Sequence, residues 1–561
     1  MSWDAEVDFL VVGSGAGGMT AAVVAAVRGA DVLVLEKTGY FGGTTALSGG
    51  VVWMPNNADM KRGGLSDSES DAVTYLKQVV GPDVAESKLR AYVREGNKML
   101  AFMEANADLR FEAALRYADY YPDLEGGKTG GRSMEPQPTS RRKLGKLSPT
   151  LRYPDYLSGF MRFAVTVKES RELMDLTLKG KWIMLRNMLV YYLDLPSRIK
   201  KMPDNRMTLG RALVVRLRLA LERLGVNVQL NTAAKELVFE NGRVTGLVVE
   251  QDGQRRRIRA RKGVLLAAGG MGQNVALRQQ YGQLPTGETF SSDSPGNVGD
   301  AIVMGKAIGA ALEFMPCAWW TPAVKLPDGE IQALISGKSM PGSIFVDGTA
   351  KRFCNEAAPY EDVVKALWDN HARGNDSVPS YMVFDARARR EYMMGPLVPG
   401  KVQPDAVLPK SYFESGFLNR GDSWQALAEQ IGVPAEQLEK TIEQHNRFAE
   451  TGRDEDYGRG DSATDRYYSD PKITPNPNLA PMVEPPFYAI PVYPGDLGTK
   501  GGLKFDEQAR VIDEAGQVID GLYVTGNCAG SVMGNSYPGA GSTIGPSMTF
   551  GYVAAMHATQ E

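Results

Sequence analysis

A glycine-rich turn near the N-terminus constrains the fold more than any other feature of this chain. Residues 6–12 predict a strand, and the apolar run at its end is typical of a strand buried in a parallel sheet. The turn Gly13-Ser14-Gly15-Ala16-Gly17-Gly18 follows directly, and residues 19–28 predict a helix. A second apolar strand at 32–35 ends at Glu36. These segments make a compact βαβ unit, so the sequence predicts an α/β fold.

The same unit predicts a site for a dinucleotide. Gly13 would permit the tight turn, Gly15 would let a pyrophosphate approach the backbone, and Gly18 would let helix and strand pack closely. The helix N-terminus would offer N–H groups and partial positive charge to the phosphates. Glu36 could accept both hydroxyls of an adenosine ribose, and its charge would repel a 2′-phosphate. A purely structural glycine turn is the alternative interpretation.

Two later strands also end in loops that fit a nucleotide domain. Residues 264–268 are apolar and lead into Gly269-Gly270, and residues 521–527 precede a helix expected from about 543 to 557. They resemble the second and third nucleotide-domain segments of large flavoproteins. Because a nicotinamide enzyme has no need for a C-terminal segment that returns to the first domain, the pattern favours FAD over NAD.

The rest of the chain reads as mixed α and β structure. Helical spacing of apolar residues predicts helices within 69–106, whereas residues 107–155 are rich in Gly, Pro, Tyr and Arg and read as loops. A helix is expected at 209–223. Further strands are expected at 226–230, 236–240 and 244–250, and an α+β pattern from about 310 to 485.

Composition limits the classes of function. The chain has 561 residues, 43% hydrophobic and 23% charged, which is ordinary for a soluble protein of several domains. A net charge of −3 argues against nucleic-acid binding. Three cysteines without a CxxC pair predict neither a disulfide framework nor a metal site. Acids in the first residues and no run of about 18 apolar residues lead us to expect a cytoplasmic protein, with no motif that predicts its oligomeric state.

Several longer motifs bring a family resemblance. They include Asp119-Tyr120-Tyr121-Pro122, Lys351-Arg352-Phe353-Cys354-Asn355-Glu356 with Pro359-Tyr360, and Tyr537-Pro538-Gly539-Ala540-Gly541. With the loops around Gly43 and Gly498, they make the chain resemble the 3-ketosteroid dehydrogenases, also called 3-oxosteroid 1-dehydrogenases. These belong to the flavoprotein class of fumarate reductase and succinate dehydrogenase. The resemblance covers nearly the whole chain.

The resemblance implies a Rossmann-like FAD-binding domain with an inserted α+β catalytic domain. We expect the first part of the FAD domain at 1–310, with a helical insertion at about 150–205, the catalytic domain at 311–485, and the second part of the FAD domain at 486–561. The FAD, held without a covalent bond, is expected to contact Gly13, Ser14, Gly15, Ala16, Gly17, Gly18, Glu36, Lys37, Gly42, Gly43, Thr44, Thr45, Ser48, Gly49, Gly50, Ala268, Gly269, Asn527, Ser542 and Ile544.

The resemblance also implies an active site of three tyrosines and one backbone amide: Tyr120, Tyr360, Tyr537 and the N–H of Gly541. Tyr537 and Gly541 would hydrogen-bond the 3-keto oxygen of a steroid and stabilise the developing negative charge. Tyr360 would take a proton from carbon 2, Tyr120 would share or relay that charge, and a hydride would leave carbon 1 for the flavin. Tyr117 and Tyr121 lie close to Tyr120 in the sequence, which makes that assignment the loosest. The family usually carries a glycine where Ala540 stands.

Alternatives remain open at several points. The same machinery could act at carbons 4 and 5 or on another cyclic ketone, or the chain could bind a steroid and only pass electrons to an acceptor such as a quinone. Dicarboxylate reduction is disfavoured because none of the three histidines lies in the motifs. The basic and apolar stretch 160–200 reads as a packed helical insertion or as a membrane-surface patch. Trp319 and Trp320 read as core or pocket wall, Arg211 as facing the flavin or the surface, and Cys354 as a buried thiol.

Overall fold

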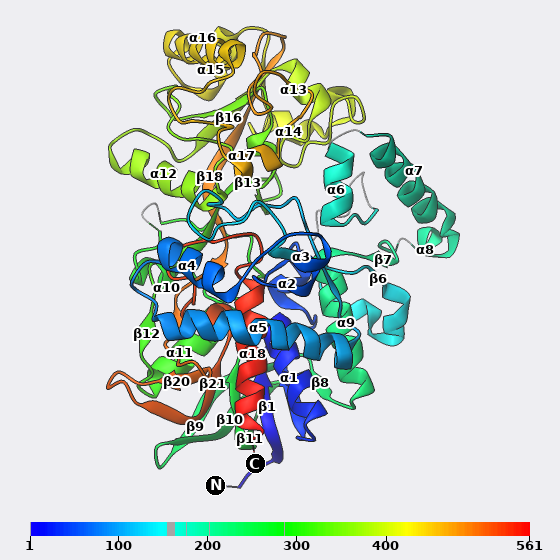
Figure 1. The fold of residues 1–561 in the computed structure, drawn as a ribbon, viewed down its shortest axis with the longest axis vertical. Helices are drawn as coiled ribbons and strands as arrows, with labels where there is room; N and C mark the ends of the chain where they lie inside the picture. The colour runs from blue at the N-terminus through cyan, green and yellow to red at the C-terminus, as the bar shows by residue number, and fades with distance from the viewer. Residues whose placement is uncertain (1, 154–162, 175–176, 201, 285–286, 561) are drawn as a thin grey trace. The chain divides into compact units, whose positions relative to one another are not determined.

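The chain forms two compact units in the computed structural model, which describes residues 2–153, 163–174, 177–200, 202–284 and 287–560. The first unit contains Met1–Gly287, Asp293–Ala318 and Gly498–Glu561. The second contains Glu288–Ser292 and Trp319–Leu497. The first unit is therefore assembled from both ends of the chain, and the sequence of the second unit is inserted between them (Figure 1).

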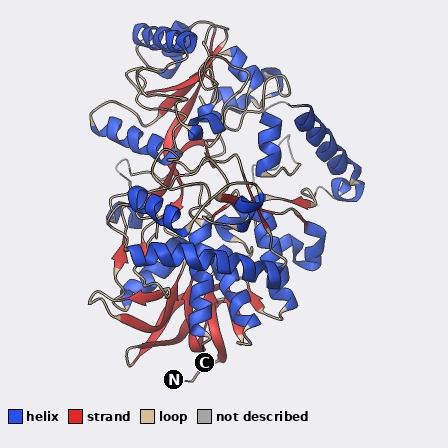
Figure 2. Ribbon diagram, in the orientation of Figure 1, coloured by secondary structure: helices blue, strands red, loops and turns tan. Residues whose placement is uncertain are grey.

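An eight-stranded sheet is the centre of the first unit (Figure 2). Its order is β20-β21-β10-β11-β1-β2-β8, and β9 pairs with β10. The run β21-β11-β1-β2-β8 is parallel, as the βαβ pattern predicts. The strands are β1 (Ala5–Val12), β2 (Val32–Leu35), β8 (Asn227–Gln229), β9 (Thr232–Glu240), β10 (Arg243–Gln251), β11 (Gln254–Leu266), β20 (Arg510–Ile512) and β21 (Val518–Val524).

Helices from the two ends of the chain pack together in this unit. The helix α1 (Ala16–Val27) contacts α18 (Ile544–Ala558), and Figure 1 shows them side by side in blue and red. The helix α1 also contacts β1 and β2, and α18 contacts β11 and β21. Residues 9–12 of β1 are buried without alternation, because a parallel sheet covered by helices leaves its strands no solvent face.

The predicted elements differ from the observed ones in two places. The prediction that residues 107–155 are all loops is wrong, because β4 (Phe111–Ala113), β5 (Ser133–Pro136), β6 (Thr139–Ser140) and the 3-10 segment η1 (Arg141–Thr150) lie there. These pieces are too short to produce a periodic apolar pattern. The strand β11 begins ten residues before the predicted 264, because its first half is rich in arginine and shows no apolar pattern. In the fold, Arg257 pairs with Glu240 on β9, and Arg259 and Arg261 pair with Glu6 on β1.

The helices predicted in 69–106 and 209–223 are confirmed. They are α4 (Glu69–Val80), α5 (Glu86–Ala107) and α9 (Leu209–Arg223). The described part of the 160–200 stretch forms α6 (Val167–Met174), α7 (Leu178–Leu193) and α8 (Leu195–Ile199), while 160–162 and 175–176 lie outside the described residues. Other elements of this unit are α2 (Gly43–Leu47), β3 (Val52–Trp53), α3 (Ala58–Arg62), β7 (Arg206–Met207), α10 (Val275–Gln280), α11 (Asp300–Ala307), β12 (Leu312–Glu313), β19 (Gly502–Leu503) and η5 (Gly526–Cys528).

The second unit is built on a six-stranded sheet of order β14-β13-β18-β16-β15, in which β17 also pairs with β18. Its core includes Ile344, Val383, Leu427 and Ile442, and Trp424 stacks on Phe487 with ring centroids 4.0 Å apart. The elements are β13 (Ala318–Lys325), β14 (Ile331–Ala333), η3 (Gly337–Ser339), β15 (Ser343–Val346), α12 (Tyr360–Ala372), β16 (Ser380–Phe384), α13 (Ala386–Glu391), η4 (Asp405–Val407), α14 (Lys410–Glu414), β17 (Asn419–Gly421), α15 (Trp424–Ile431), α16 (Ala435–Thr451), α17 (Ala463–Tyr467) and β18 (Phe487–Thr499).

Candidate active site

The turn between β1 and α1 has the geometry of a phosphate-binding loop. Gly13 has φ +107°, and a Cβ there would lie 2.3 Å from the carbonyl oxygen of Ala267. A Cβ on Gly18 would lie 2.3 Å from the carbonyl oxygen of Gly13, so helix and strand approach as closely as the pattern predicts. At Gly15 the nearest atom to a Cβ would be 3.7 Å away, which leaves this backbone open to a ligand.

Glu36 at the end of β2 organises the loops around it. Its carboxylate accepts hydrogen bonds from the Ser14 hydroxyl at 2.6 Å and from the Thr38 N–H at 3.0 Å. The Ser14 hydroxyl oxygen in turn accepts from the N–H of Gly42 at 3.0 Å. The Lys37 ammonium forms an ion pair with Asp300 at 2.5 Å. Glu36 thus joins the predicted phosphate turn to the loop that begins at Gly42.

The loop that contains Gly42–Gly50 closes over the same turn. The Thr45 hydroxyl accepts from the N–H of Ala16 at 3.1 Å, at the first residue of α1. The Ser48 hydroxyl donates to the Thr45 carbonyl at 2.7 Å and accepts from the N–H of Gly50 at 3.0 Å. The loop that holds the predicted cofactor residues is therefore fixed to the start of α1.

Two residues that the sequence did not single out join this cluster. Asp293 accepts from the Thr44 hydroxyl and from the Asn297 amide, the latter at 2.5 Å. Asn297 also lies against Gly269, where a Cβ would come within 2.4 Å of its side-chain oxygen. The signal that could have found them is the polar run 291–300 directly before α11.

The third predicted nucleotide segment lies at the end of β21. Asn527 lies in η5, and a Cβ on Gly498 would come within 2.5 Å of its side-chain nitrogen. The neighbouring Cys528 is fully buried, and its thiol bonds to the carbonyl of Leu266 at 3.3 Å. Ser542 is also fully buried, and Ile544 is the first residue of α18.

These loops all belong to the first unit, and their chemistry fits FAD. The glycine turn offers backbone N–H groups at the start of α1, and Glu36 offers a carboxylate at the end of β2. The open backbone at Gly15 is the feature that a pyrophosphate requires.

Two of the predicted catalytic tyrosines lie together in the first unit. The ring centroids of Tyr120 and Tyr537 are 5.3 Å apart. The N–H of Tyr120 donates to the carbonyl of Pro538 at 3.0 Å, and the Tyr75 hydroxyl donates to the same carbonyl at 2.6 Å. The two tyrosine segments are therefore joined through the backbone as well as through their rings.

Gly541 lies in the same loop as Tyr537, in a conformation that favours glycine. It has φ +100°, and a Cβ would lie 2.5 Å from both the Trp53 nitrogen and the Val52 carbonyl carbon. Within the described part of the chain, the N–H of Gly541 has no protein acceptor. The Tyr537 hydroxyl lies 3.3 Å from the Thr543 hydroxyl. The loop thus presents a phenol and an available backbone donor.

A buried ion-pair cluster supports this part of the site. The Arg132 guanidinium is fully buried and bonds to both oxygens of Asp67 and, at 2.8 Å, to Asp119. The other Asp119 oxygen accepts from the Trp53 indole N–H at 2.7 Å. Burial raises the pKa of Asp119 to about 6, against the opposing effect of Arg132. Asp119 immediately precedes Tyr120, so this cluster fixes the backbone that carries that tyrosine.

Tyr360 belongs to the second unit. It is the first residue of α12, directly after Pro359, and it is 7% exposed.

Trp319 and Trp320 are buried in β13 of the same unit, and Trp320 makes an edge contact with Trp368. Burial raises the pKa of the Cys354 thiol far above its usual range, so it is an inert thiol. In the first unit, Arg211 lies over the ring of Tyr153, 5.6 Å from its centroid.

The fold and the cofactor loops define a flavoprotein, and the comparisons with known proteins agree. The family model for the FAD binding domain matches residues 8–544. A 3-oxosteroid 1-dehydrogenase of Mycobacterium tuberculosis is 41% identical over 98% of both chains. The chain belongs to the 3-oxosteroid 1-dehydrogenase family within these FAD-binding flavoproteins.

Two further relatives show the range of the family. The crystal structure of 3-ketosteroid delta1-dehydrogenase from Sterolibacterium denitrificans, in complex with 1,4-androstadiene-3,17-dione, matches with a TM-score of 0.95 and 42% identity over 99% of both chains. A 4-oxocyclohexanecarboxylate 2-dehydrogenase of Sinomonas cyclohexanicum is 35% identical over 98% of this chain and 92% of its own. Both relatives are named for compounds that carry a ring ketone.

Proposed function

We propose that the chain is an FAD-dependent oxidoreductase that introduces the 1,2 double bond into the A ring of 3-ketosteroids. The observation that carries this proposal is the close Tyr120–Tyr537 pair, together with the available N–H of Gly541 four residues after Tyr537 in the same loop. A phenol and a backbone amide that converge on one oxygen are the donors that an enolate-like transition state needs. The 41% identity to a 3-oxosteroid 1-dehydrogenase supports the steroid as substrate.

The roles of the residues follow from this chemistry. Tyr537 and the Gly541 N–H hydrogen-bond the 3-keto oxygen, which makes the protons on carbon 2 more acidic. Tyr360 takes one of those protons as the general base, and Tyr120 shares the resulting charge. When held by the loops around Gly13 and Glu36, FAD would supply the two-electron acceptor for the hydride that leaves carbon 1. A free tyrosine has a pKa of about 10, so Tyr360 can act near neutral pH only if its surroundings stabilise the phenolate.

The cofactor is proposed to be held without a covalent bond by the loops around Gly13, Glu36, Gly42, Gly269 and Asn527. Cys528 follows Asn527 directly, and its thiol already lies within hydrogen-bond distance of two backbone carbonyls. Acid precipitation of the purified protein should therefore leave all flavin in the supernatant. Flavin that stays with the precipitate would contradict this part of the proposal.

The first experiment is anaerobic mixing of the purified protein with androst-4-ene-3,17-dione. The flavin absorbance should bleach, and product analysis should show the 1,4-diene. An enzyme specific for carbons 4 and 5 would leave this substrate unchanged and act only on the ring-saturated ketone. Bleaching by 4-oxocyclohexanecarboxylate but not by the steroid would assign the chain to the small cyclic ketones.

The variants Tyr537→Phe and Tyr360→Phe test the catalytic assignment. Both should keep bound flavin and lose turnover, and loss of one oxyanion donor typically costs about 10²–10³-fold in kcat. Wild-type rates in both variants would instead favour a steroid-binding protein that only passes electrons.

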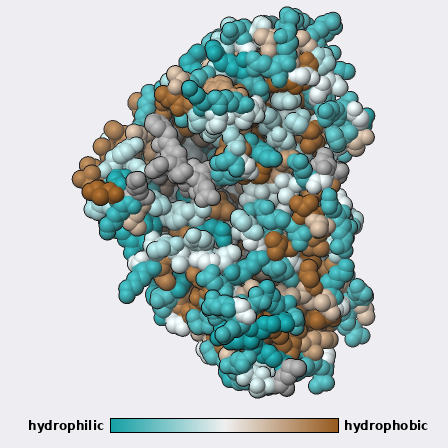
Figure 3. All heavy atoms as spheres, turned by 180° about the vertical axis from the view of Figure 1, so that it is seen from behind, coloured by the Kyte–Doolittle hydropathy of each residue, from teal (hydrophilic) through white to brown (hydrophobic). Residues whose placement is uncertain are grey.

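A peripheral membrane contact through α7 and α8 is also proposed, because the exposed face of α7 is more apolar than its buried face. The buried positions are Gly180, Ile183, Asn187 and Tyr191. The exposed face carries large apolar side chains at helical spacing, among them Trp182 at 62% and Leu193 at 73% exposure. In Figure 3 apolar side chains gather at the left edge, in the region of α7 and α8. The exposed set on the two helices is Leu178, Trp182, Leu185, Leu189, Val190, Tyr192, Leu193, Leu195 and Ile199.

The charge of this segment fits an anionic lipid surface. Residues 178–200 contain five Lys or Arg residues and one acid, in a chain whose net charge is −3. An interfacial helix combines apolar residues, aromatic residues and flanking cations in this way. Within the described residues, no helix combines the length and the apolar character needed to cross a bilayer. A steroid and a quinone-type electron acceptor both partition into lipid, so contact with a bilayer surface would supply both.

Co-sedimentation with phosphatidylserine-rich vesicles tests this contact. The wild type should sediment with the vesicles, less so at high salt. A Trp182→Ser, Leu185→Ser, Leu189→Ser triple variant should stay in the supernatant with unchanged turnover. A control triple variant at other exposed positions, Val303→Ser, Val407→Ser and Val483→Ser, should sediment like the wild type. Equal sedimentation of both variants would contradict the proposal, and a smaller oligomer for the first variant alone would identify the face as a contact between copies.

A further inference from the structure

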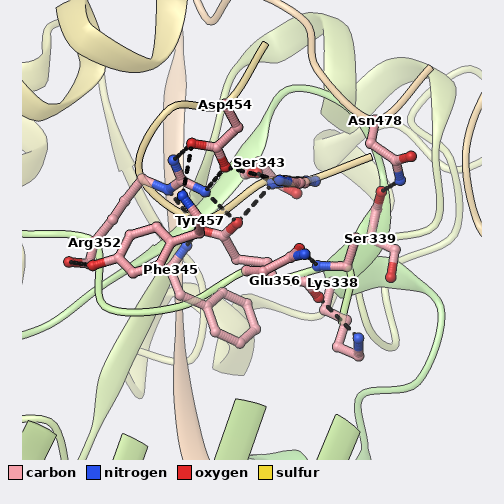
Figure 4. Close-up of polar contacts among 12 residues, drawn as sticks. Lys338, Ser339, Ser343, Phe345, Arg352, Glu356, Asp454, Tyr457 and Asn478 are labelled. Carbon is pink, nitrogen blue, oxygen red and sulfur yellow. Dashed lines mark hydrogen bonds and ion pairs between the residues drawn. The ribbon is translucent and has the colours of Figure 1, made fainter. Parts of the chain in front are cut away.

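A buried lysine in the second unit bonds to two backbone carbonyls that precede Tyr360. The Lys338 side chain lies in η3 and is 3% exposed. Its ammonium donates to the carbonyl of Glu356 at 2.8 Å and to that of Ala358 at 2.5 Å, and Figure 4 shows it in this position. Among the described residues, no carboxylate lies within ion-pair distance of it. A buried cation without a counter-ion in contact is costly, so this arrangement needs an explanation.

The segment held by Lys338 is also fixed through its side chains. The Glu356 carboxylate is fully buried and bonds to Arg352 at 2.9 Å (Figure 4). It also bonds to Arg459 at 3.1 Å. Although burial acts in the opposite direction, these two guanidinium groups lower the pKa of Glu356 to about 2. Asp454 holds Arg352 from the other side at 2.9 Å. The side chain of Glu356 is therefore held in place by two arginines. Lys338 holds the backbone carbonyls of Glu356 and of Ala358, which lies two residues after it.

The fixed segment leads directly into the predicted base. The side chain of Asn355 donates to Asp465 at 2.9 Å and accepts from the N–H of Ala357 at 2.9 Å. Lys338 holds the carbonyl of Ala358, and Pro359, whose ring restricts φ, comes next. Tyr360 follows as the first residue of α12. Few backbone torsions separate the Lys338 contact from Tyr360, so the lysine restricts where that tyrosine can lie.

We infer that Lys338 is a positioning residue for Tyr360, which it holds through the carbonyls of Glu356 and Ala358. The inference rests on the proposed function, in which Tyr360 removes the proton from carbon 2. Catalysis of this kind depends on placement, and a misplacement of about 1 Å can cost about 10²-fold in rate. An apolar side chain at position 338 would leave both carbonyls without a donor and release the start of α12.

The test is a double-mutant cycle between Lys338→Met and Tyr360→Phe. Lys338→Met should lower kcat by about 10–100-fold while the KM for androst-4-ene-3,17-dione and the flavin content stay close to the wild type. In the Tyr360→Phe background, the same Lys338→Met change should have almost no further effect, because the residue through which it acts is already disabled. Lys338→Gln, whose amide can still donate to a carbonyl, should recover part of the lost rate.

Lys440→Met is the matched control, since it removes an exposed lysine from α16 of the same unit and should leave kcat unchanged. If Lys338→Met does not accumulate as a folded protein with bound flavin, Lys338→Gln replaces it in the double-mutant cycle with Tyr360→Phe. A wild-type kcat in Lys338→Met, or an equal loss in both backgrounds, would overturn the inference. A wild-type rate in Tyr360→Phe alone would instead overturn the proposed role of Tyr360, so the two failures are distinguishable.

Discussion

At the scale of single residues, the candidate site depends on backbone positions at which only glycine fits. Gly541 has a left-handed φ and lies against the backbone of Val52 and Trp53. The same packing fixes the loop that carries both Tyr537 and the Gly541 N–H, which the proposed function needs as donors. The glycine at position 541 therefore fixes the shape of the loop and, through it, the position of the proposed backbone donor.

The variant Gly541→Ala should consequently have a lower catalytic activity, while the range of substrates that it accepts stays the same. The new Cβ would clash with the backbone of β3, which would move the N–H away from the ketone oxygen. We expect kcat/KM for the steroid to fall by about 10²–10³-fold. Ala540→Gly, one position away, is the control and should stay near the wild type, because the family usually carries a glycine there. Steady-state kinetics on both variants decides the matter, and a wild-type kcat/KM in Gly541→Ala would remove this amide from the site.

At the scale of elements, the loops around Tyr120 are held by charge rather than by regular structure. Arg132 immediately precedes β5 and is fully buried. It joins Asp67, in the loop before α4, to Asp119, in the loop before Tyr120. Three segments of the chain thus meet at one guanidinium, and the short strands β3, β4 and β5 lie beside it.

Arg132→Met should therefore destabilise the protein strongly. Removal of one member of a buried ion pair leaves uncompensated charge and typically costs about 3–5 kcal/mol. Arg94→Met is a suitable control, because its ion pair with Glu69 is exposed and such pairs contribute about 0–1 kcal/mol. Urea unfolding followed by circular dichroism measures both. Equal losses for the two variants would show that the Arg132 cluster contributes no more than a surface pair.

At the scale of the whole molecule, the two units have separate cores, and that of the second contains a buried histidine. His445 on α16 is fully buried, and its Nε2–H donates to the carbonyl of Ala480 at 3.2 Å. Burial lowers its pKa to about 3, because the charged imidazolium is disfavoured there. Between that value and the usual 6.5, the unfolded chain binds a proton that the folded chain does not.

Acid should therefore weaken the second unit through His445. The stabilising effect of keeping this histidine neutral is complete above pH 6.5 and is lost progressively as the pH falls toward 3. Comparison of the wild type with His445→Gln isolates this contribution, because glutamine does not titrate. The difference in unfolding free energy between the two proteins should shrink by about 2 kcal/mol from pH 7 to pH 5. A difference that stays constant over this range would show that His445 does not titrate differently in the folded and unfolded protein.

The nucleotide-binding fold could be predicted from the amino-acid sequence, because the pattern that specifies it is local. The apolar strand, the glycines at 13, 15 and 18, and the acid at 36 lie within about 30 residues, so their pattern can be recognised without any distant residue. Longer elements with clear periodicity, such as α9, were predicted for the same reason. The residues of the family motifs were also readable, because those motifs are continuous in the chain.

The distant residues that hold those motifs in place could be identified only in the folded chain. Asp293 and Asn297 stand in a polar run that does not show what they bind, and Lys338 stands in a stretch without a diagnostic pattern. The partners of all three residues come into contact with them only after folding. The apolar outer face of α7 is a second case, since helical spacing alone cannot say which side of a helix is covered. Burial and long-range pairing depend on the whole fold, and so the supporting residues of the site could not be read from the sequence.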